Sequence, residues 1–536
     1  MTTERLTHRE RHLRSLRRQP VDRAPDVEFG AWVQTFDRWE REGMDRRACR
    51  GLTSHTTMVD RTFGTDAEDY GVGLALNLNL LPLFDEIVIE DRGQTEILQD
   101  KEGALVEQLK PEYGASIPRH IRYAIRTRAD WERVCDERLD PSHPDRTPPF
   151  LDALIERLKA ADYPVLVHAG SIYGRIRDWV GVENLSLMLY DDRALVEEMM
   201  EHMTQLSLRV LERLAGHGLT IDRADWWEDM CVRSGSLLSP RHFRELMVPR
   251  YKRITDFLRR EFGAEFNRLD CDGNIHQLVL PWLDGGINVM FPIEVAHTDP
   301  FRVADQLGER GLQHGAFDKR ALIEGPPAID AELERLRPLV ERGLVVPFTD
   351  HLVPPDVSLE NYSYYRRKKC ELIGKTWRGT GVQTCPGQLM QWRLAGLFDS
   401  FDVAHPPELD GRAVAWQPHT TTIASGDVDL IEAMGNVHKG VAYAAGSIHS
   451  PGERRGWLDL SYDDSLRVWL NGELLWSRTD HPNGVPRQVS IPTQLRAGQN
   501  DLLCQVARAE AGDEWGFMCR AVDAYGQPWQ DVDYHA

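Results

Sequence analysis

Between about residues 150 and 350, short apolar runs alternate with longer segments whose apolar residues recur at helical spacing. Strands separated by helices run parallel, because each helix carries the chain back to the starting edge of the sheet. Continued over this length, the pattern favours an α/β fold closed into a (β/α)8 barrel over an open sheet. The expected strands are PVLVHAG (164–170), TIDRADWWED (220–229), EFNRLD (265–270), INVMFPI (287–293), LQHGAF (312–317) and LVVPFT (344–349).

The chain before residue 150 is less regular. APDVEFG (24–30) is expected to form the first strand, and residues 84–128 are expected to form an inserted hairpin region. The arginine-rich N-terminus contains Glu4 and Glu10, which favours a basic amphipathic helix over a transit peptide. We therefore assign residues 1–375 to the barrel domain.

Residues 391–536, after a linker at 376–390, have a different pattern. Short alternating runs such as WLDLSYD, LRVWLNGELLW and DLLCQVAR are separated by turn sequences, including Asn471-Gly472 and Asn483-Gly484. Asn-Gly is typical of the type I′ turn that joins two antiparallel strands. Many short strands at close spacing predict an all-β sandwich.

Charge and hydropathy limit the classes of partner. The formal net charge of -20 would repel phosphate backbones and anionic lipids, which excludes nucleic acid and membrane as main partners. No apolar run reaches the roughly 20 residues needed to span a bilayer. The eight cysteines are scattered without a CxxC pair, as expected for reduced thiols in the cytoplasm. A cytoplasmic protein that binds a small molecule is expected.

Polar side chains lie at the carboxyl end of each expected barrel strand. The carboxyl ends of barrel strands open onto one shared cavity, so these groups are expected to meet there. Carboxylates that face one cleft raise one another's pKa values, and with histidines they suit metal binding or acid/base catalysis. A single polar residue at a strand end often only caps the next helix, so the prediction depends on the whole ring. The ring comprises Glu28, His168, Glu228, Asp229, Asp270, Asp272, Glu294, Asp318, Lys319, Asp350 and His351.

Six sequence blocks occur in order over about residues 5–370. They are RHLRSLRRQPVDRAP, GVENLSLMLYDD, WEDMCVRSGSLLSPRHFRELMVPRYKRI, DCDGNIHQLVLPWLDGGINVMFPIEV, GAFDKRAL and HLVPPDVSLENYSYY. Together they resemble the uroporphyrinogen decarboxylase superfamily, whose fold is a (β/α)8 barrel. Authentic decarboxylases of that family carry arginines just after the first strand to hold a polycarboxylate substrate. Here DVEFGAWVQTFDRW has no arginine before Arg38, which argues against a porphyrinogen substrate.

The resemblance extends to a second branch, methyltransferases that move methyl groups between corrinoid proteins and thiols. Their zinc is held by His-x-Cys before Gly-Asn and by a Cys before Pro-Pro. Matching residues 273–274 and 354–355 to these motifs places Asp270, Asp272 and His351 at the ligand positions. Two carboxylates and an imidazole widen the choice of divalent metal from zinc to manganese, iron or magnesium. A corrinoid carried by a partner protein is implied as well.

A site without metal is an equal alternative, in which Asp272 and His351 handle protons around a small substrate. Cys271 is expected to face away from this site by strand alternation and to be a buried structural thiol. Lys319 is expected to pair with Asp318 or to hold an anionic group.

The C-terminal fragments SYDDSLRVWLNGELLW and LRAGQNDLLCQVA resemble the carbohydrate-binding jelly rolls attached to glycoside hydrolases. In such domains this motif is a structural hairpin, so Asp463, Asp464 and Asn471 are expected to stabilise the fold. We expect packing or homodimerisation from the sandwich rather than sugar binding.

Three functions remain open. The first is methyl transfer or demethylation of a small polar substrate, and the second is decarboxylation of a small acid by a lyase. The third is a non-catalytic, carbohydrate-associated binding protein. The expected catalytic residues are Asp272, His351, Asp270 and Glu228, and the expected substrate-binding residues are Glu28, His168, Trp226, Asp229, Glu294, Asp318 and Lys319.

Overall fold

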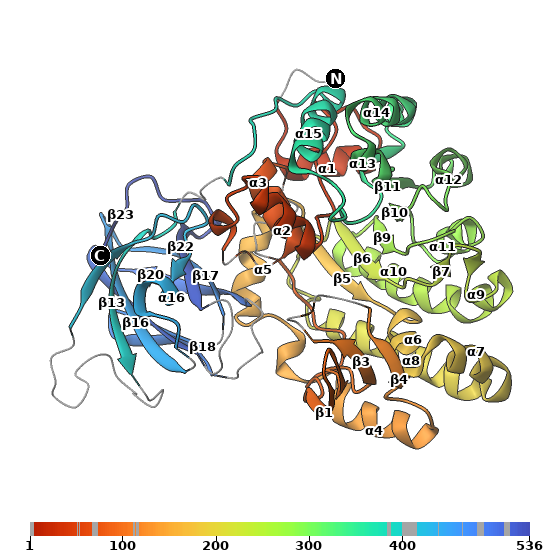
Figure 1. Cartoon of the computed structure of the whole chain (residues 1–536), viewed down its shortest axis with the longest axis horizontal. Coiled ribbons are helices and arrows are strands. Elements are labelled where there is room, and N and C mark those ends of the chain that lie inside the picture. Colours follow the sequence, from red (N-terminus) through yellow and green to blue (C-terminus); the bar gives the residue numbers. More distant parts are fainter. Residues whose placement is uncertain are drawn as a thin grey trace.

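The structure is a computed structural model. It describes residues 5–50, 52, 54–66, 73–110, 113, 117–382, 387–398, 415–437, 439–463, 465–479, 487–508 and 515–536. A mixed α/β part, up to about residue 375, lies beside an all-β part drawn in blue in Figure 1. Within these ranges, no helix is long and apolar enough to cross a membrane.

A six-stranded parallel sheet forms the centre of the α/β part, as the alternating pattern predicts. Its order is β5-β6-β9-β10-β11-β12. Two parallel bridges extend its edges, from Leu74 to Val167 and from Ala31 to Val353. The segment APDVEFG thus contributes no regular strand of its own. The strands are β5 (Leu166–Gly170), β6 (Arg223–Trp227), β9 (Asn267–Asp270), β10 (Val289–Ile293), β11 (Leu312–Phe317) and β12 (Val345–Thr349).

Helices connect the strands and cover the outside of the sheet (Figure 1). The Ser239-Pro240 pair starts a helix for a local reason: the Ser239 side chain accepts a hydrogen bond from the His242 amide, and proline occupies the first helical position. The helices are α6 (Gly174–Val180), α7 (Val182–Asp191), α8 (Arg193–Glu212), α9 (Pro240–Leu246), α10 (Val248–Phe262), α11 (Val279–Asp284), α12 (Pro300–Leu307), α13 (Arg320–Glu324), α14 (Pro326–Glu341) and α15 (Leu359–Ile373).

The N-terminal third surrounds this sheet with helices and a small second sheet. Residues 84–128 contain four antiparallel strands in the order β1-β2-β3-β4, a larger element than the predicted hairpin. These strands are β1 (Ile87–Arg92), β2 (Thr95–Gln99), β3 (Leu105–Leu109) and β4 (Arg119–Arg122). The helices of this third are α1 (His8–Leu16), α2 (Val33–Arg41), α3 (His55–Phe63), α4 (Arg128–Arg138) and α5 (Leu151–Lys159).

Strand alternation divides the parallel sheet into two faces. One face forms a small apolar core of its own, in which Phe29 contacts Phe291 with ring centroids 4.7 Å apart and Phe291 contacts Phe348 at 5.8 Å. The segment of Phe29 bridges the chain beyond β12, yet Phe29 contacts Phe291 on β10, so the sheet curves around this face. The core comprises Leu16, Val27, Phe266, Val289, Phe291, Leu312, Val346 and Phe348.

The C-terminal part consists of two antiparallel sheets packed around a separate core, as predicted for a sandwich. Asn471 and Gly472 both have positive φ, 53° and 82°, as a type I′ turn requires. Asn483-Gly484 and Asp464 lie outside the described residues. One sheet contains β13 (Gln391–Phe398), β14 (Gln417–Thr420), β16 (Gly440–Ser450), β18 (Ser465–Leu470), β19 (Glu473–Arg478), β21 (Gly498–Arg508) and β23 (Asp533–His535); the other contains β15 (Val428–Asp429), β17 (Arg454–Tyr462), β20 (Arg487–Leu495) and β22 (Gly516–Asp523).

The two parts share an interface with buried charges. Arg157 on α5 donates two hydrogen bonds to Asp459 on β17, at 2.6 and 2.8 Å, and its side chain is only 2% exposed. The Arg157 guanidinium also lies 5.1 Å from the ring centroid of Trp457. Trp457 belongs to the apolar core of the α/β part, so the core continues across the interface.

Candidate functional site

Asp272 and His351 meet at the carboxyl ends of β9 and β12. The distance from His351 Nε2 to Asp272 Oδ2 is 3.2 Å. Strands β9 and β12 are separated by β10 and β11, which in a flat sheet would keep these ends about 14 Å apart. Curvature of the sheet therefore creates this pair, and strand order alone does not.

Two aromatic side chains flank the imidazole of His351. The Trp32 ring lies nearly parallel to it, with centroids 6.0 Å apart and an interplanar angle of 26°. Phe29 meets it edge-on at 5.6 Å. Trp32 is 46% exposed, so its indole presents a free aromatic surface beside the imidazole. Trp32 is not among the residues that the sequence predicts for the site.

Asp270 and Asp229 surround Asp272 with further carboxyl groups. Burial raises the pKa of Asp270 well above its ordinary value, and the charge of Asp272 raises it further. Burial also raises the pKa of Asp229, although Arg177 opposes the shift. Asp229 has a φ of 43°, a backbone conformation that residues other than glycine rarely adopt. The pKa values of two of the three carboxyl groups are therefore raised, chiefly by burial.

Two arginines outside the predicted ring, Arg175 and Arg177, lie on α6 beside the site. The guanidinium groups of Arg175 and Arg177 lie 4.6 and 5.2 Å from the ring centroid of Trp227. Trp227 pairs in register with Asp270 and occupies the same face of the sheet. Arg177 also donates a hydrogen bond to the Asp229 carbonyl. Among the described residues, the ionic contacts of Arg175 are longer, to Glu102 at 3.6 Å and Asp178 at 3.8 Å.

Glu228 has a different role from the catalytic one that was predicted. Its carboxylate is fully buried and accepts hydrogen bonds from the amides of Ile172, Tyr173 and Gly174 at 2.7 to 2.9 Å. The Tyr251 hydroxyl donates another at 2.7 Å. Through these contacts Glu228 positions the loop between β5 and α6.

Glu28, which was predicted to bind substrate, lines the same cavity as His168, and its carboxylate is held by buried cations. Strand alternation turns it away from Val27 and Phe29, toward α15. There Arg366 and the Lys369 ammonium bind its carboxylate, with the Lys369 contact at 2.7 Å. The side chains of all three charged residues are 0% exposed. Glu28 therefore belongs to a buried ion cluster.

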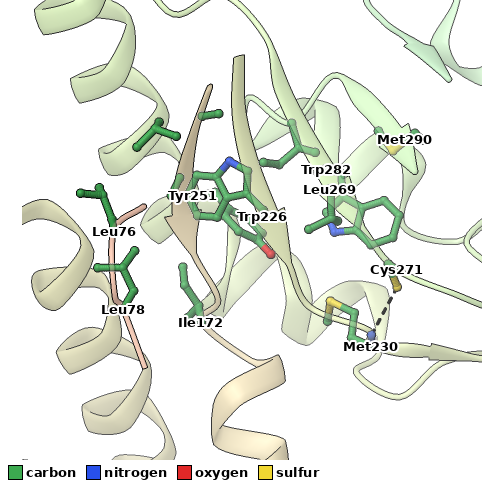
Figure 2. Packing of buried hydrophobic residues seen from close by; sticks show 14 of the residues in the cluster. Leu76, Leu78, Ile172, Trp226, Met230, Tyr251, Leu269, Cys271, Trp282 and Met290 are labelled. Carbon is green, nitrogen blue, oxygen red and sulfur yellow. Dashed lines mark hydrogen bonds between the residues drawn. The ribbon is translucent and has the colours of Figure 1, made fainter. Parts of the chain in front are cut away.

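Trp226 was predicted to wall the pocket, but it packs outward. Figure 2 shows it among buried apolar side chains, and its ring meets that of Tyr251 edge-on at 5.1 Å. Trp227, one residue later, takes the inward position. Cys271 packs in the same cluster, where its sulfur accepts a hydrogen bond from the Met230 amide at 3.3 Å (Figure 2). Burial raises the Cys271 pKa well above its ordinary value, as expected for a structural thiol.

The loops after β10 and β11 bring Glu294 and Lys319 together. The Lys319 ammonium lies 3.7 Å from Glu294, and Glu294 also accepts a hydrogen bond from the Gly273 amide, next to Asp272. Asp318, the predicted partner of Lys319, instead binds Arg320 at 2.6 Å. Glu294 and Lys319 thus lie beside the Asp272–His351 pair, whereas the carboxylate of Asp318 is engaged elsewhere.

His168 faces the inside of the curved sheet. It lines a cavity of about 520 Å³ together with Asp225 and Arg268. Arg268 donates to both oxygens of Asp225, at 3.0 and 2.8 Å. Burial lowers the pKa of His168, so the neutral imidazole is favoured there. His168 therefore lies in the interior, below the strand ends where Asp272 and His351 meet.

Asp350 links three loops at the site and titrates in an accessible range. Its oxygens accept hydrogen bonds from the amides of Val295 and Lys319, at 2.9 and 3.0 Å. Burial raises its pKa from 3.8 to about 6. Because the native state binds this proton more tightly than the unfolded chain, stability is expected to fall as the pH rises from about 4 to above 6.

The size of this effect can be measured against a variant that lacks the titration. We expect the free energy of unfolding of Asp350→Asn, relative to the wild type, to rise by about 3 kcal/mol between pH 4 and pH 7. Urea denaturation at several pH values checks this. A difference that is constant with pH would contradict the assigned pKa.

The predicted metal ligands do not form a metal centre as arranged. In the described parts of the chain, no three His, Cys, Asp or Glu side chains are placed so that they could hold a metal ion. The imidazole nitrogen Nε2 of His351 is directed at Asp272 itself. We therefore derive no chemical step through a metal.

Comparison with known proteins gives one family match. Residues 108–366 match the family model described as Uroporphyrinogen decarboxylase (URO-D). No curated protein matches the chain. Among solved structures, a methyltransferase from Methanosarcina mazei shares 16% identity at a TM-score of 0.42, over 68% of this chain and 99% of its own. A family 35 carbohydrate binding module from Clostridium thermocellum shares 11% identity at a TM-score of 0.15, over 26% of this chain and 99% of its own.

Proposed function

Since residues 108–366 make this chain a member of the uroporphyrinogen decarboxylase superfamily, we propose that it is an enzyme that transfers a methyl group to or from a small polar substrate. The observation that supports the proposal is the 3.2 Å contact between His351 Nε2 and Asp272 Oδ2 at the strand ends. Such a pair can take and return the proton that accompanies the reaction.

The proposed chemistry uses the pair as an acid/base unit. A nucleophile that accepts a methyl group must lose a proton, and a heteroatom that loses a methyl group must gain one. Asp272 holds the Nε2 proton of His351, which leaves the lone pair on Nδ1 to take the proton of the nucleophile. The carboxylate then stabilises the imidazolium. Trp32 covers one face of this ring and supplies an apolar wall for the substrate.

Decarboxylation of a small acid is the second candidate, favoured by Arg175 and Lys319. Their cationic groups lie near Trp227 and Glu294, on the same side of the sheet as Asp272. A guanidinium and an ammonium suit a substrate carboxylate. A protonated His351 would then deliver the proton that replaces the departing carbon dioxide.

The first candidate function, methyl transfer, implies a cofactor and a partner protein, and both remain proposals. We propose a corrinoid carried by a partner protein as methyl donor or acceptor, in the cytoplasm. The predicted metal is tested by elemental analysis of the purified wild type and Asp272→Ala proteins. Stoichiometric zinc, manganese or iron that is lost in the variant would support a metal site.

Closure of the parallel sheet into a barrel is also a proposal. We propose that the sheet closes into an eight-stranded barrel, with residues 27–31 and 74–78 as the remaining strands. The parallel bridges Ala31–Val353 and Leu74–Val167 support this. A jelly-roll topology, sugar binding and self-association of the sandwich stay predictions.

The two reactions are distinguished by their products. Purified protein is incubated with cob(I)alamin and a panel of methylated amines, thiols and ethers, and formation of methylcobalamin is followed by absorbance. Release of carbon dioxide from small carboxylic acids is measured in parallel. Methylcobalamin formation supports the first candidate, whereas carbon dioxide without methyl transfer supports the second. Absence of both, together with retention of the full chain on immobilised glycan, would favour the non-catalytic alternative.

A further inference from the structure

A cavity of about 910 Å³ lies between the α/β part and the sandwich. Its walls come from α1, α3, the segment after α15, and strands β17, β20 and β22. The volume is within the range of sites for small organic molecules, and such sites are common at domain interfaces. Neither Asp272 nor His351 lines it, so it is separate from the proposed acid/base site.

The charge of this cavity is opposite to that of the whole protein. Seven lining residues are Lys or Arg and five are Asp, which gives a local excess of two positive charges in a chain with a net charge of -20. A cationic cleft in an anionic protein concentrates anions. The basic lining residues are Arg5, Arg11, Arg23, Arg61, Lys375, Arg378 and Arg520, and the acidic ones are Asp22, Asp60, Asp66, Asp162 and Asp459.

Part of this basic lining is already neutralised. Arg23 binds both oxygens of Asp66, at 2.5 and 2.7 Å, and the Lys375 ammonium lies 2.6 Å from Asp26. Arg11 binds Asp22 through Nε and Nη2, each at 2.8 Å. These pairs contribute little net charge to the cavity.

Three other arginines of the lining, Arg5, Arg61 and Arg378, are available to a ligand. Within the described residues, the side chains of Arg5, Arg61 and Arg378 make neither an ion pair nor a hydrogen bond. Arg11 is 3% exposed, and its Nη1 is buried without a hydrogen-bond partner, 3.8 Å from Asp66. A buried donor without an acceptor costs free energy, which a bound oxyanion would recover. Four guanidinium groups thus have spare donors around one cavity.

We propose that this cavity binds a small organic polyanion that carries phosphate or several carboxylates. Guanidinium groups bind both oxyanions with paired hydrogen bonds, which is why the two share this chemistry. Phe63, Trp377 and Met518 supply apolar walls for the carbon skeleton. Because strands of the sandwich complete the cavity, the ligand contacts both parts of the chain and links them.

The test is calorimetric titration of the full chain with sodium pyrophosphate and, separately, with sodium citrate at constant ionic strength. Saturable binding of one ligand per chain is expected for at least one of them, and the tighter one identifies the class. Arg61→Glu and Arg378→Glu are expected to raise its Kd by about 10- to 100-fold. The matched control Arg367→Glu, on the exposed face of α15, is expected to leave the Kd within about twofold.

Three results would overturn the proposal. One is the absence of saturable binding by either anion, and another is an equal loss of affinity in the Arg367→Glu control. The third is a clear change of the Kd in Asp272→Asn, above all tighter binding, which would place the anion beside that carboxylate at the acid/base site. Thermal unfolding without ligand verifies that each variant folds, and Arg61→Met replaces Arg61→Glu if the reversed charge prevents folding.

Discussion

Asp272→Asn is expected to lower kcat/KM by about 10²- to 10⁴-fold in whichever of the two assays detects activity. The amide keeps the size of the carboxylate but cannot stabilise an imidazolium on His351, 3.2 Å away. It also favours the wrong ring tautomer, because the amide nitrogen donates to Nε2 where the carboxylate accepts. The loss should appear mainly in kcat.

His351→Gln should produce a loss of similar size, and the double variant should be little worse than either single one. Groups that act as one unit show such non-additive effects. Asp284→Asn, the same exchange at an exposed position at the end of α11, is the matched control and should retain full activity. Activity within threefold of the wild type in both Asp272→Asn and His351→Gln would refute the proposed acid/base pair.

Arg366→Met is expected to destabilise the protein by about 3 to 5 kcal/mol, because it leaves two buried carboxylates without their main counter-ion. Arg366 donates to both oxygens of Asp26, at 2.9 and 2.8 Å, and also to Glu28. Burial alone would raise the pKa of Asp26, but Arg366, Lys369 and Lys375 hold it well below its ordinary value. The cluster ties the segment around residues 26–28 to α15.

Urea denaturation followed by tryptophan fluorescence measures this effect. Arg366→Lys retains one charge and should lose less stability than Arg366→Met, since it forfeits only the paired hydrogen bonds. Arg367→Met, the neighbouring exposed position, is the control and should change stability by less than about 1 kcal/mol. If Arg366→Met and Arg367→Met were equally stable, the buried ion cluster would not stabilise the folded protein as we infer.

Much of the architecture could be predicted because it depends on local patterns. The six apolar runs became β5, β6 and β9 to β12 of the parallel sheet, since a short β-branched run bounded by polar residues has few other stable arrangements. Ser239-Pro240 and Asn471-Gly472 gave a helix start and a turn for equally local reasons. APDVEFG was an exception: it forms no regular strand, and the nearest parallel bridge is at Ala31, the residue after it.

The site was predicted less completely, because a polar residue at a strand end looks the same whatever it later contacts. Glu228 and Glu28 resembled Asp272 in sequence position, yet backbone amides satisfy the first and Arg366 the second. Alternation showed that Trp226 and Trp227 face opposite ways, but not which of them faces inward.

The sequence by itself determined the order of strands and helices, the division into two parts, and the set of polar residues at the strand ends. Tertiary structure decided which of these residues meet. The contact between Asp272 and His351 depends on sheet curvature, and the approach of Trp32, Arg175 and Arg177 depends on how distant loops and helices pack. Such contacts depend on how the whole chain packs, so a short stretch of sequence cannot predict them.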